Sequence, residues 1–457
     1  MTIDTQIIRD KNIFYIIKSF LQNKDTKEAI TLYANHLLVI CMFFLPIYKQ
    51  PISSIGMVTL VFLFLIRGDY KYYLKEAVSN RIVQACIIIF LVHAIWLLGS
   101  DNIKLGKDMV ANSRYFLFSI IILFFADKLF IKKFLFAFIL GMLSSEILSY
   151  LIHFEIVPYR LEILDKIIYK AQGLNNPTPF LVHYEYNTLL SVVVGILLYN
   201  LLANKNRLYI KLISIFFIAT ASINLILIGG RIGYIAYIAV IFLTLFMIYR
   251  KKFFKIALPT AMIGLSIFFF TAYNSGGLFQ ERIDSVVSDY NEMSKEDDNI
   301  NTSVGLRIFM WKYGLEVIQN NFLFGVGTGD QMPSIKEVAS DKHAKYIIFH
   351  HPHNAYIEYF LQFGIFGLIA LLNLFYQVYR VKIEDVSTRV YLHIINISFL
   401  VFMLTNRFSR YMILVFLLLT LTVSTKNIYL KNREIIYNNR TFIFYTLFIL
   451  LFFLRGL

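Results

Sequence analysis

The sequence contains few charged residues and very little cysteine. Asp, Glu, Lys and Arg make up 16% of the 457 residues, whereas soluble domains typically contain about 25%. This shortage of charge argues against a soluble protein. The two cysteines, Cys41 and Cys86, both lie inside apolar runs, and no closely spaced pair suggests a zinc site or a disulfide framework. We therefore expect both cysteines to be small side chains that face lipid or the protein core.

The first 30 residues lack the features of a secretory signal peptide. Charged residues interrupt them, so no continuous apolar region leads to a cleavage site of small residues. We expect residues 1–30 to form a cytosolic, partly amphipathic segment. Neither an internal repeat nor a low-complexity tract is visible in the rest of the sequence.

Apolar residues dominate the remainder of the chain. Hydrophobic residues account for 58% of the sequence, and the mean hydropathy is +0.63. They gather in runs of about 20 residues, the length that a helix needs to cross a bilayer core of about 30 Å. About thirteen such windows can be counted. Because the windows 52–66, 113–126 and 441–454 are short, a total of twelve spans fits the sequence equally well. The sequence predicts an all-α polytopic integral membrane protein with about 12–13 transmembrane helices.

Membrane topology accounts for the net charge of +15. When the N-terminus is placed in the cytosol, every short loop on the cytosolic side is rich in Lys and Arg, which is the positive-inside pattern. Basic proteins can also bind nucleic acid, but this distribution of charge makes that interpretation unnecessary. We expect a multi-pass protein with a cytoplasmic N-terminus and no nucleic-acid partner.

Two segments on the predicted outer side are longer than the others, and they cover residues 153–183 and 274–354. Only the second is large enough to form a small extramembrane subdomain. It contains an acidic patch at 285–299, then a helical pattern, then the glycine-rich turn FGVGTGD. The predicted division of the chain is a cytosolic segment, an N-terminal transmembrane bundle, a large outer loop and a C-terminal transmembrane bundle, at residues 1–30, 31–273, 274–354 and 355–457.

Three histidines lie where the large outer loop returns to the membrane. His350, His351 and His353 precede a long apolar run. Pro352 disfavours helix at the residue before it, and Asn354 is well suited to cap the helix that follows. An imidazole has a pKa near 6.5 and can act as a general base at neutral pH. The histidines could also form a solvated loop end or bind a metal, although no Cys, Asp or Glu cluster stands beside them in the sequence.

Two arginines stand in apolar surroundings near the outer face. Arg231, in LIGGRIGYIAY, lies at the outer end of a predicted span, where charge is costly and commonly marks function. Arg307, in SVGLRIFMWKYGLEVI, lies on the apolar side of a predicted helix. Guanidinium groups offer paired donors suited to phosphate, so both arginines are candidate anion ligands. Arg231 could instead anchor to lipid headgroups, and Arg307 could form a salt bridge with the acidic patch.

Further cations are predicted on the outer side. Lys104, Lys107, Arg114 and Arg160 could help a polyanionic lipid headgroup to dock. A simple charge at the membrane surface is the alternative for each of them. We retain Arg114 and Arg160 as candidate substrate-binding residues.

The order of these motifs resembles that of the bacterial O-antigen ligase and O-antigen polymerase superfamily, a group of lipid-linked glycan ligases. In that family an arginine begins a span, and a G-x-R helix and a G-x-G turn follow in a large periplasmic loop. An H-x-H-N run then precedes a helix that contains G-x-x-G. The matching residues here, between about 220 and 370, are Arg231, Gly305 with Arg307, Gly325 with Gly327, His351 with His353 and Asn354, and Gly364 with Gly367.

The resemblance implies a GT-C-like glycosyltransferase of the bacterial inner membrane, with one large periplasmic loop subdomain and a periplasmic active site. Its donor would be a glycan carried on undecaprenyl pyrophosphate. The acceptor would be a sugar of lipid A-core for a ligase, or a lipid-linked repeat unit for a polymerase. The resemblance further implies that the reaction needs no metal and no other cofactor, and that Asn354, Gly305, Gly325 and Gly327 help to bind substrate.

The residues also suit this chemistry. Negative charge builds on the pyrophosphate as the glycosidic bond breaks, and Arg231 and Arg307 could stabilise that charge in a site of low dielectric. The attacking sugar hydroxyl must lose its proton, which His353 or His351 could accept. Attack opposite the leaving group would invert the anomeric centre. We slightly favour His353 as the base, since the His-Asn pair is the most recurrent part of the family motif.

Several functions remain open on the sequence alone. We prefer an O-antigen ligase because one large outer loop carries both Arg307 and the histidines. A polymerase of O-antigen or another surface polysaccharide shares the same motifs, and a protein-targeting oligosaccharyltransferase is a further relative. A flippase or transporter of lipid-linked oligosaccharides should carry charges in the middle of its spans, whereas the cations of interest here cluster at one face.

Overall fold

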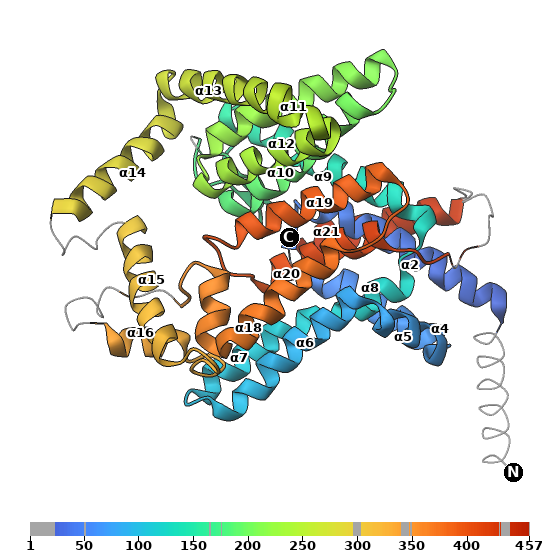
Figure 1. The fold of residues 1–457 in the computed structure, drawn as a ribbon. Coiled ribbons are helices and arrows are strands. Elements are labelled where there is room, and N and C mark those ends of the chain that lie inside the picture. Colours follow the sequence, from blue (N-terminus) through green and yellow to red (C-terminus); the bar gives the residue numbers. More distant parts are fainter. Residues whose placement is uncertain are drawn as a thin grey trace, which may run out of the picture.

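The chain forms an α-helical bundle in the computed structural model (Figure 1), which describes residues 23–49, 52–163, 166–174, 176–295, 303–339, 347, 350–428, 430 and 439–456. Within these residues the only sheet is a short two-stranded hairpin. The predicted all-α polytopic fold is therefore confirmed. Most of the predicted cytosolic segment 1–30 and part of the acidic patch 285–299 lie outside the described residues.

In the described chain, eight helical segments are long and apolar enough to cross a membrane, and four shorter apolar helices accompany them. The long segments are α2 (Lys24–Phe44), α6 (Arg81–Trp96) with η2 (Leu97–Gly99), α7 (Ile103–Ser113) with η3 (Arg114–Leu117) and α8 (Phe118–Phe125), η4 (Lys128–Phe130) with α9 (Ile131–His153), α10 (His183–Ala203), α11 (Leu208–Ile228), α12 (Arg231–Tyr249) with η5 (Arg250–Lys252), η6 (Phe253–Ala257) and α13 (Leu258–Asn274), and α18 (Ala355–Tyr379). The shorter ones are η1 (Ile52–Gly56) with α4 (Met57–Arg67), α19 (Val386–Phe402), α20 (Arg410–Ser424) and the apolar part of α21 (Asn439–Gly456).

The remaining helices cover the ends of the bundle. They are α5 (Tyr70–Ser79), α14 (Gly277–Lys295), α15 (Ser303–Asn320) and α16 (Gln331–Val338). In Figure 1, α14, α15 and α16 lie together at one end of the bundle, and α15 packs against α16 and α18. The large outer loop predicted from the sequence therefore contributes three helices to a single end.

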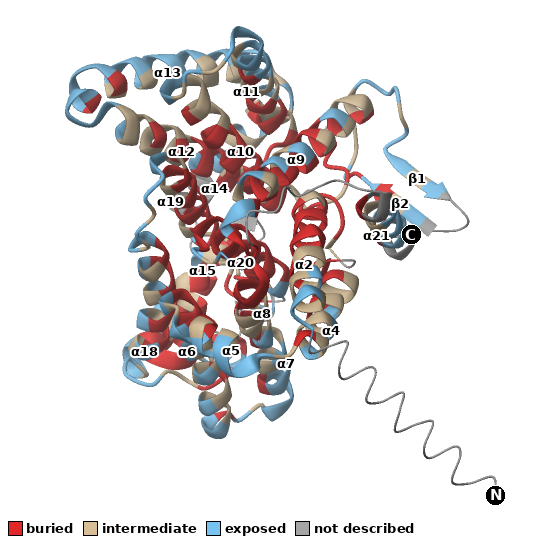
Figure 2. Cartoon of the chain, turned by 90° about the vertical axis from the view of Figure 1, so that its right-hand side faces the viewer, coloured by how far each residue is buried: buried red, intermediate tan, exposed pale blue. Residues whose placement is uncertain are grey.

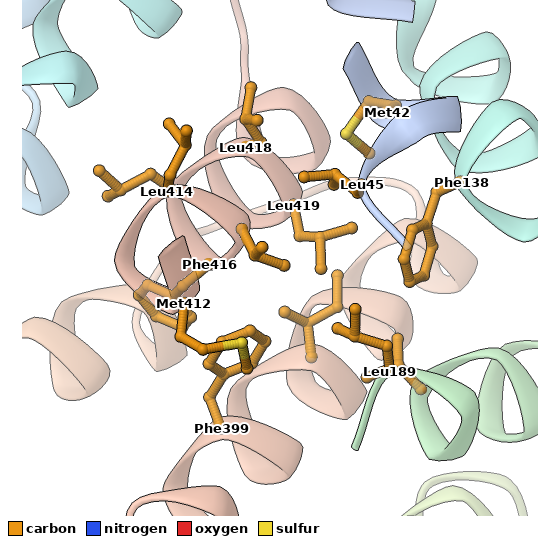
Figure 3. Close-up of a cluster of buried hydrophobic side chains, with 14 of the residues drawn as sticks. Met42, Leu45, Phe138, Leu189, Phe399, Met412, Leu414, Phe416, Leu418 and Leu419 are labelled. Carbon is orange, nitrogen blue, oxygen red and sulfur yellow. The ribbon is translucent and has the colours of Figure 1, made fainter. Parts of the chain in front are cut away.

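The core is centred on α20. All of its residues from Tyr411 to Ser424 are buried, as expected for a helix that is apolar on every side. Figure 3 shows Met412, Phe416 and Leu419 of this helix packed among side chains from α2, α9, α10 and α19. Because α20 has only 15 residues, sequence length alone makes it a weak candidate span, but its burial makes it the centre of the fold.

Helices at the periphery expose large apolar side chains instead. In α13, Phe270 is 71% exposed and Ile263 is 62% exposed, and in α11 Phe216 is 61% exposed. Figure 2 shows the contrast between these outer helices and the buried α20, α2 and α10. Contiguous exposed apolar surface of this kind is typical of a face that contacts lipid or another protein.

A kink in α18 fixes the glycine-rich turn. Gly364 has φ of 61°, and a Cβ at this position would lie 2.2 Å from the carbonyl oxygen of Leu323. The kink leaves backbone groups of α18 without partners inside the helix, and the segment 322–326 bonds to them. The Val326 N–H donates to Leu361 O at 2.8 Å, and the Ile365 N–H donates to Phe322 O at 3.0 Å. Glycine is required here because this backbone conformation and close approach leave no room for a side chain.

Asp330 anchors the same turn to the connection between α6 and α7. Its carboxylate accepts hydrogen bonds from Ser100 Oγ at 2.8 Å, from the Asp101 N–H at 2.8 Å and from the Asn102 N–H at 2.9 Å. Such hydrogen bonds to a charged acceptor are about twice as strong as neutral ones. The turn at 324–330 is thus held between α18 and the end of α6.

The second long loop contains a β-hairpin. Strands β1 (Arg160–Ile163) and β2 (Lys166–Lys170) pair antiparallel, with Arg160 opposite Lys170. Arg160 forms an exposed ion pair with Glu162 on its own strand. The hairpin was not predicted, because five or fewer residues per strand leave little periodic signal.

Candidate active site

A cavity of about 380 Å³ lies at the end of the bundle that carries α14, α15 and α16. Residues of α10, α12, α14, α15 and the connection between α19 and α20 line it. Three arginines contribute to the lining, namely Arg231, Arg282 and Arg307, and His183 stands beside them. Among the described residues that line this cavity there is no Asp or Glu, so its charge is strongly positive.

Glycines bring Arg231 to this cavity. Gly229 ends α11 with φ of 67°, and α12 begins at Arg231 directly after Gly230. A Cβ on Gly230 would lie 2.8 Å from Asn187 Nδ2 of α10. The glycines therefore let the turn between α11 and α12 pack tightly against its neighbours. Within this turn Arg231 Nη2 donates a hydrogen bond to Ser285 Oγ of α14 at 2.5 Å.

Trp311 orients the helix that carries Arg307. Its indole Nε1 donates to the carbonyl oxygen of Pro352 at 2.8 Å, which ties α15 to the turn of the histidines. Arg307 and Trp311 are four residues apart and therefore share one face of α15, and both line the cavity. Burial and the nearby Arg231 guanidinium lower the pKa of Arg307, but an arginine stays charged at neutral pH.

The histidines form a compact pair beside this cavity. The ring centroids of His351 and His353 are 4.2 Å apart, and the His353 N–H donates to His351 Nδ1 at 3.2 Å. His353 has φ of 54°, a left-handed conformation that is uncommon for a residue with a side chain and often occurs at functional sites. The chain is thus held in a costly local conformation that keeps the two rings together.

Both imidazoles are neutral at physiological pH. Burial and then the Arg307 guanidinium lower the pKa of His353 to about 4. Burial, the adjacent His353 and the Arg407 guanidinium lower the pKa of His351 to about 3. Both rings are therefore in the unprotonated form that a general base requires, and the contribution of Arg307 to the lowered pKa of His353 indicates that these two predicted residues lie close together.

Asn354 has a structural role that the sequence indicated. Its side-chain oxygen accepts a hydrogen bond from the Ile357 N–H at 3.1 Å and caps α18.

Gly305 is buried near the start of α15, two residues before Arg307. Gly325 and Gly327 lie in the turn that packs on α18, and they line a different hollow. Their predicted contact with substrate stays a prediction.

Two other predicted substrate-binding residues do not line the arginine cavity. Arg160 is on the β-hairpin, paired with Glu162, and Arg114 is exposed in η3. Of the predicted catalytic residues, Arg231 and Arg307 line the cavity, whereas His351 and His353 do not line it and lie in a turn that the hydrogen bond from Trp311 to Pro352 ties to it. The contact of Arg160 and Arg114 with a substrate is likewise untested.

Arg282 and His183 line the cavity although neither was predicted from the sequence. Arg282 lies on α14, and its Nε is buried without a hydrogen-bond partner among the described residues. His183 begins α10, and its Nδ1 is buried and also without such a partner. The rule applied to His351 and His353, an imidazole directly before an apolar helix, also selects His183. No sequence signal distinguishes Arg282 from a surface arginine, because its neighbours in the chain are polar.

The cavity suits a polyanionic group. Three guanidinium groups in partly buried positions bind phosphate oxygens through paired, charge-assisted hydrogen bonds. The described part of the chain contains no group of three or more His, Cys, Asp or Glu side chains that could hold a metal ion. Among the described lining residues, Arg231, Arg282 and Arg307 offer positive charge to a ligand.

Comparison with known proteins identifies the segment that builds this site. The family described as O-antigen ligase matches residues 216–372, from α11 to α18. This range includes Arg231, Arg282 and Arg307, together with His351 and His353. No curated protein matches the chain. Residues 216–372 are thus similar to the O-antigen ligase family, and the eight long apolar helices of the described residues support a multi-pass membrane protein.

Proposed function

We propose that the protein is an O-antigen ligase. It transfers a glycan from undecaprenyl pyrophosphate to a sugar hydroxyl of lipid A-core on the periplasmic face of the inner membrane. The observation that carries this proposal is the cavity with three arginines, together with a neutral histidine pair whose turn is tied to the cavity by the hydrogen bond from Trp311 to Pro352. A pyrophosphate leaving group needs cations such as these arginines to stabilise its charge, and a hydroxyl nucleophile needs a base such as a neutral histidine to accept its proton.

The arginines stabilise the leaving group. As the glycosidic bond breaks, its electron pair stays on the pyrophosphate oxygen, and negative charge grows there. Arg231, Arg282 and Arg307 surround the cavity where this charge would develop. The N-terminus of α12, which begins at Arg231, adds the positive end of a helix dipole. In many enzymes, donors that are fixed in advance around a developing charge supply most of the rate enhancement.

His353 fits the role of general base better than His351 does. His351 Nδ1 accepts a hydrogen bond from the His353 N–H, so the ring proton of neutral His351 lies on Nε2. The basic nitrogen of His351 is therefore occupied by the backbone. His353 contributes its backbone N–H rather than its ring to this hydrogen bond, and its ring lies close enough to Arg307 for that charge to lower its pKa. These two observations support His353 as the group that takes the proton from the acceptor hydroxyl.

Donor binding strengthens this base. In the free protein the Arg307 charge helps to hold the pKa of His353 at about 4, where imidazole is a weak base. Burial is the larger cause of this low pKa, and a pyrophosphate bound to Arg307 offsets the second cause, so the pKa of His353 rises when the donor is present. The base thus gains strength in the complex that needs it.

The reaction needs no covalent enzyme intermediate. The acceptor oxygen attacks the anomeric carbon, its proton passes to His353, and undecaprenyl pyrophosphate leaves from the opposite side. The anomeric centre is inverted. Three arginines supply the charge stabilisation in this scheme, which is why we propose a metal-independent mechanism without a cofactor.

A strain deleted for the gene tests the proposal. Lipopolysaccharide is examined on a gel, and undecaprenyl-linked glycans are extracted in parallel. Full-length glycan is expected to accumulate on undecaprenyl pyrophosphate while lipid A-core stays bare. A core that still receives single repeat units, with long chains lost, would identify a polymerase instead. Complementation with the wild-type gene and with Lys312→Gln, an exposed change on α15 outside the cavity, should restore the glycan, whereas His353→Ala should not.

A further inference from the structure

A second cavity, of about 420 Å³, lies beside the turn of the histidines. It is built from α7, from α16 with the glycine that precedes it, and from two single residues, His350 and Arg407. It shares no lining residue with the arginine cavity. Its mixture of groups is also different, because the acidic Asp108 stands there together with Lys336 and Arg407.

The histidine turn lies next to both cavities, because His350 lines the second cavity and Trp311, which lines the first, donates a hydrogen bond to Pro352 O at 2.8 Å. Asn406 lines the arginine cavity, and the next residue, Arg407, lines the second cavity. His350 lines the second cavity, whereas Arg307 of the first cavity lowers the pKa of His353. The guanidinium groups of both Arg407 and Arg307 lower the pKa of His351. A base at this turn is therefore adjacent to two binding spaces.

The second cavity contains a buried polar group that lacks a partner. Gln331 is only 1% exposed, and its Oε1 makes no hydrogen bond within the described residues. Buried polar atoms are normally hydrogen-bonded, so such an orphan calls for a partner from outside the protein. A hydroxyl group is a donor that would satisfy this oxygen.

Among the charged residues that line the cavity, the two cations Lys336 and Arg407 outnumber the one carboxylate, Asp108. Arg407 Nε is buried without a hydrogen-bond partner among the described residues, and its Nη2 is 4.0 Å from Glu358 Oε1, at the limit of an ion pair. Lys336 is exposed at the rim. Met109 and Met332 form an apolar wall, against which the apolar face of a sugar ring can lie.

We propose that this cavity is the acceptor subsite, and that it binds a sugar that carries a phosphate or carboxylate group. The inference rests on the proposed glycan transfer. Gln331 accepts a hydrogen bond from a sugar hydroxyl, and Arg407 and Lys336 hold the acidic group. The reactive hydroxyl of the same acceptor then reaches across the histidine turn, toward a donor whose pyrophosphate occupies the arginine cavity.

Steady-state kinetics of the purified full-length protein in nanodiscs tests the subsite. The donor is undecaprenyl-pyrophosphate-linked glycan, and the acceptor is lipid A-core. The test variants are Lys336→Gln and Gln331→Leu, combined in one chain, because Leu keeps the volume of Gln but cannot accept a hydrogen bond. Lys312→Gln is the matched control, because it removes the same charge from an exposed position outside both cavities.

We expect the double variant to raise the KM for the acceptor at least tenfold while the KM for the donor changes by less than twofold. Acceptor preparations treated with phosphatase, or reduced at their carboxyl groups, then distinguish the two sources of negative charge. The acceptor preparation that lacks the acidic group held by Lys336 should bind the wild-type and Lys336→Gln proteins with equal affinity.

Two results would overturn the inference. One is an acceptor KM that stays within twofold of the wild-type value in the double variant. The other is a rise in the donor KM alone, which would assign the cavity to the donor. Failure of the proposed function looks different, since the wild-type protein would then transfer nothing to lipid A-core. In that case the same variants are measured with a lipid-linked repeat unit as acceptor, and an unchanged KM there refutes the subsite independently.

Discussion

Replacing Arg307 by alanine is expected to remove a large part of the transition-state stabilisation. Arg307 lines the cavity on the same face of α15 as Trp311, and its pKa is lowered by burial and by Arg231. Two unit charges 4 Å apart attract by about 4 kcal/mol at an effective dielectric constant near 20. Because Arg307 is only partly buried, screening reduces this figure, and we use about 3 kcal/mol.

A loss of about 3 kcal/mol corresponds to a decrease of about 100-fold in kcat/KM, since about 1.4 kcal/mol is a factor of ten. Arg307→Lys keeps the charge but loses the paired donors, so we expect a decrease of about tenfold. Glycan transfer to lipid A-core by purified protein measures both values. The Lys312→Gln control should match the wild-type protein.

The stability of the variant separates a chemical effect from misfolding. Burial and then the Arg231 charge lower the pKa of Arg307, so replacing Arg307 by alanine removes a partly buried charge and its repulsion by Arg231 in the free protein. We expect the Tm of Arg307→Ala to stay at or above the wild-type value. A folded Arg307→Ala protein with kcat/KM within threefold of wild type would refute the assignment of this arginine to the leaving group.

Three further predictions concern the pH dependence, the kink and the orientation of α15. Because the pKa of free His353 is lowered to about 4, its basic form persists at pH 5.5, and kcat/KM there should stay above about 80% of its plateau. An unperturbed histidine with a pKa of 6.5 would fall to about 10%. Gly364→Ala, whose Cβ would lie 2.2 Å from Leu323 O, should lower the stability by at least about 2 kcal/mol. Gly264→Ala, whose Cβ would contact nothing within 4 Å, should not lower Tm, because alanine favours a helix more than glycine does. A Gly364→Ala protein with the Tm of the wild type would contradict the role of the kink. Trp311→Phe loses the hydrogen bond to Pro352 and should lower kcat about tenfold with an unchanged fold by circular dichroism. An unchanged kcat would show that α15 is positioned by other contacts.

The bundle was largely predictable because its signal is local. Runs of apolar residues directly reflect the length of a membrane-crossing helix, and the predicted window 52–66 corresponds to η1 with α4, which together cover Ile52–Arg67. The central position of α20 was not predictable in the same way. Burial on every side depends on which helices surround it, and no short sequence window contains that information.

Site residues were predictable where a charged or titratable side chain stands directly beside an apolar run. Arg231 at the start of an apolar helix and the histidines before α18 are conspicuous for this reason. Arg282 lies in a polar stretch, and only the packing of α14 brings it to the cavity. The choice between His351 and His353 likewise required the backbone hydrogen bond to His351 Nδ1, which no spacing rule provides.

General-base catalysis by His353 is tested most sharply when donor binding and glycan transfer are measured on the same His353→Asn protein. Asparagine tolerates the left-handed backbone found at this position, where φ is 54°, but it cannot act as a base at neutral pH. The variant is expected to bind undecaprenyl-pyrophosphate-linked glycan within threefold of the wild-type affinity and to lose at least about 100-fold in transfer rate. Transfer at the wild-type rate by this variant would show that His353 is not the base.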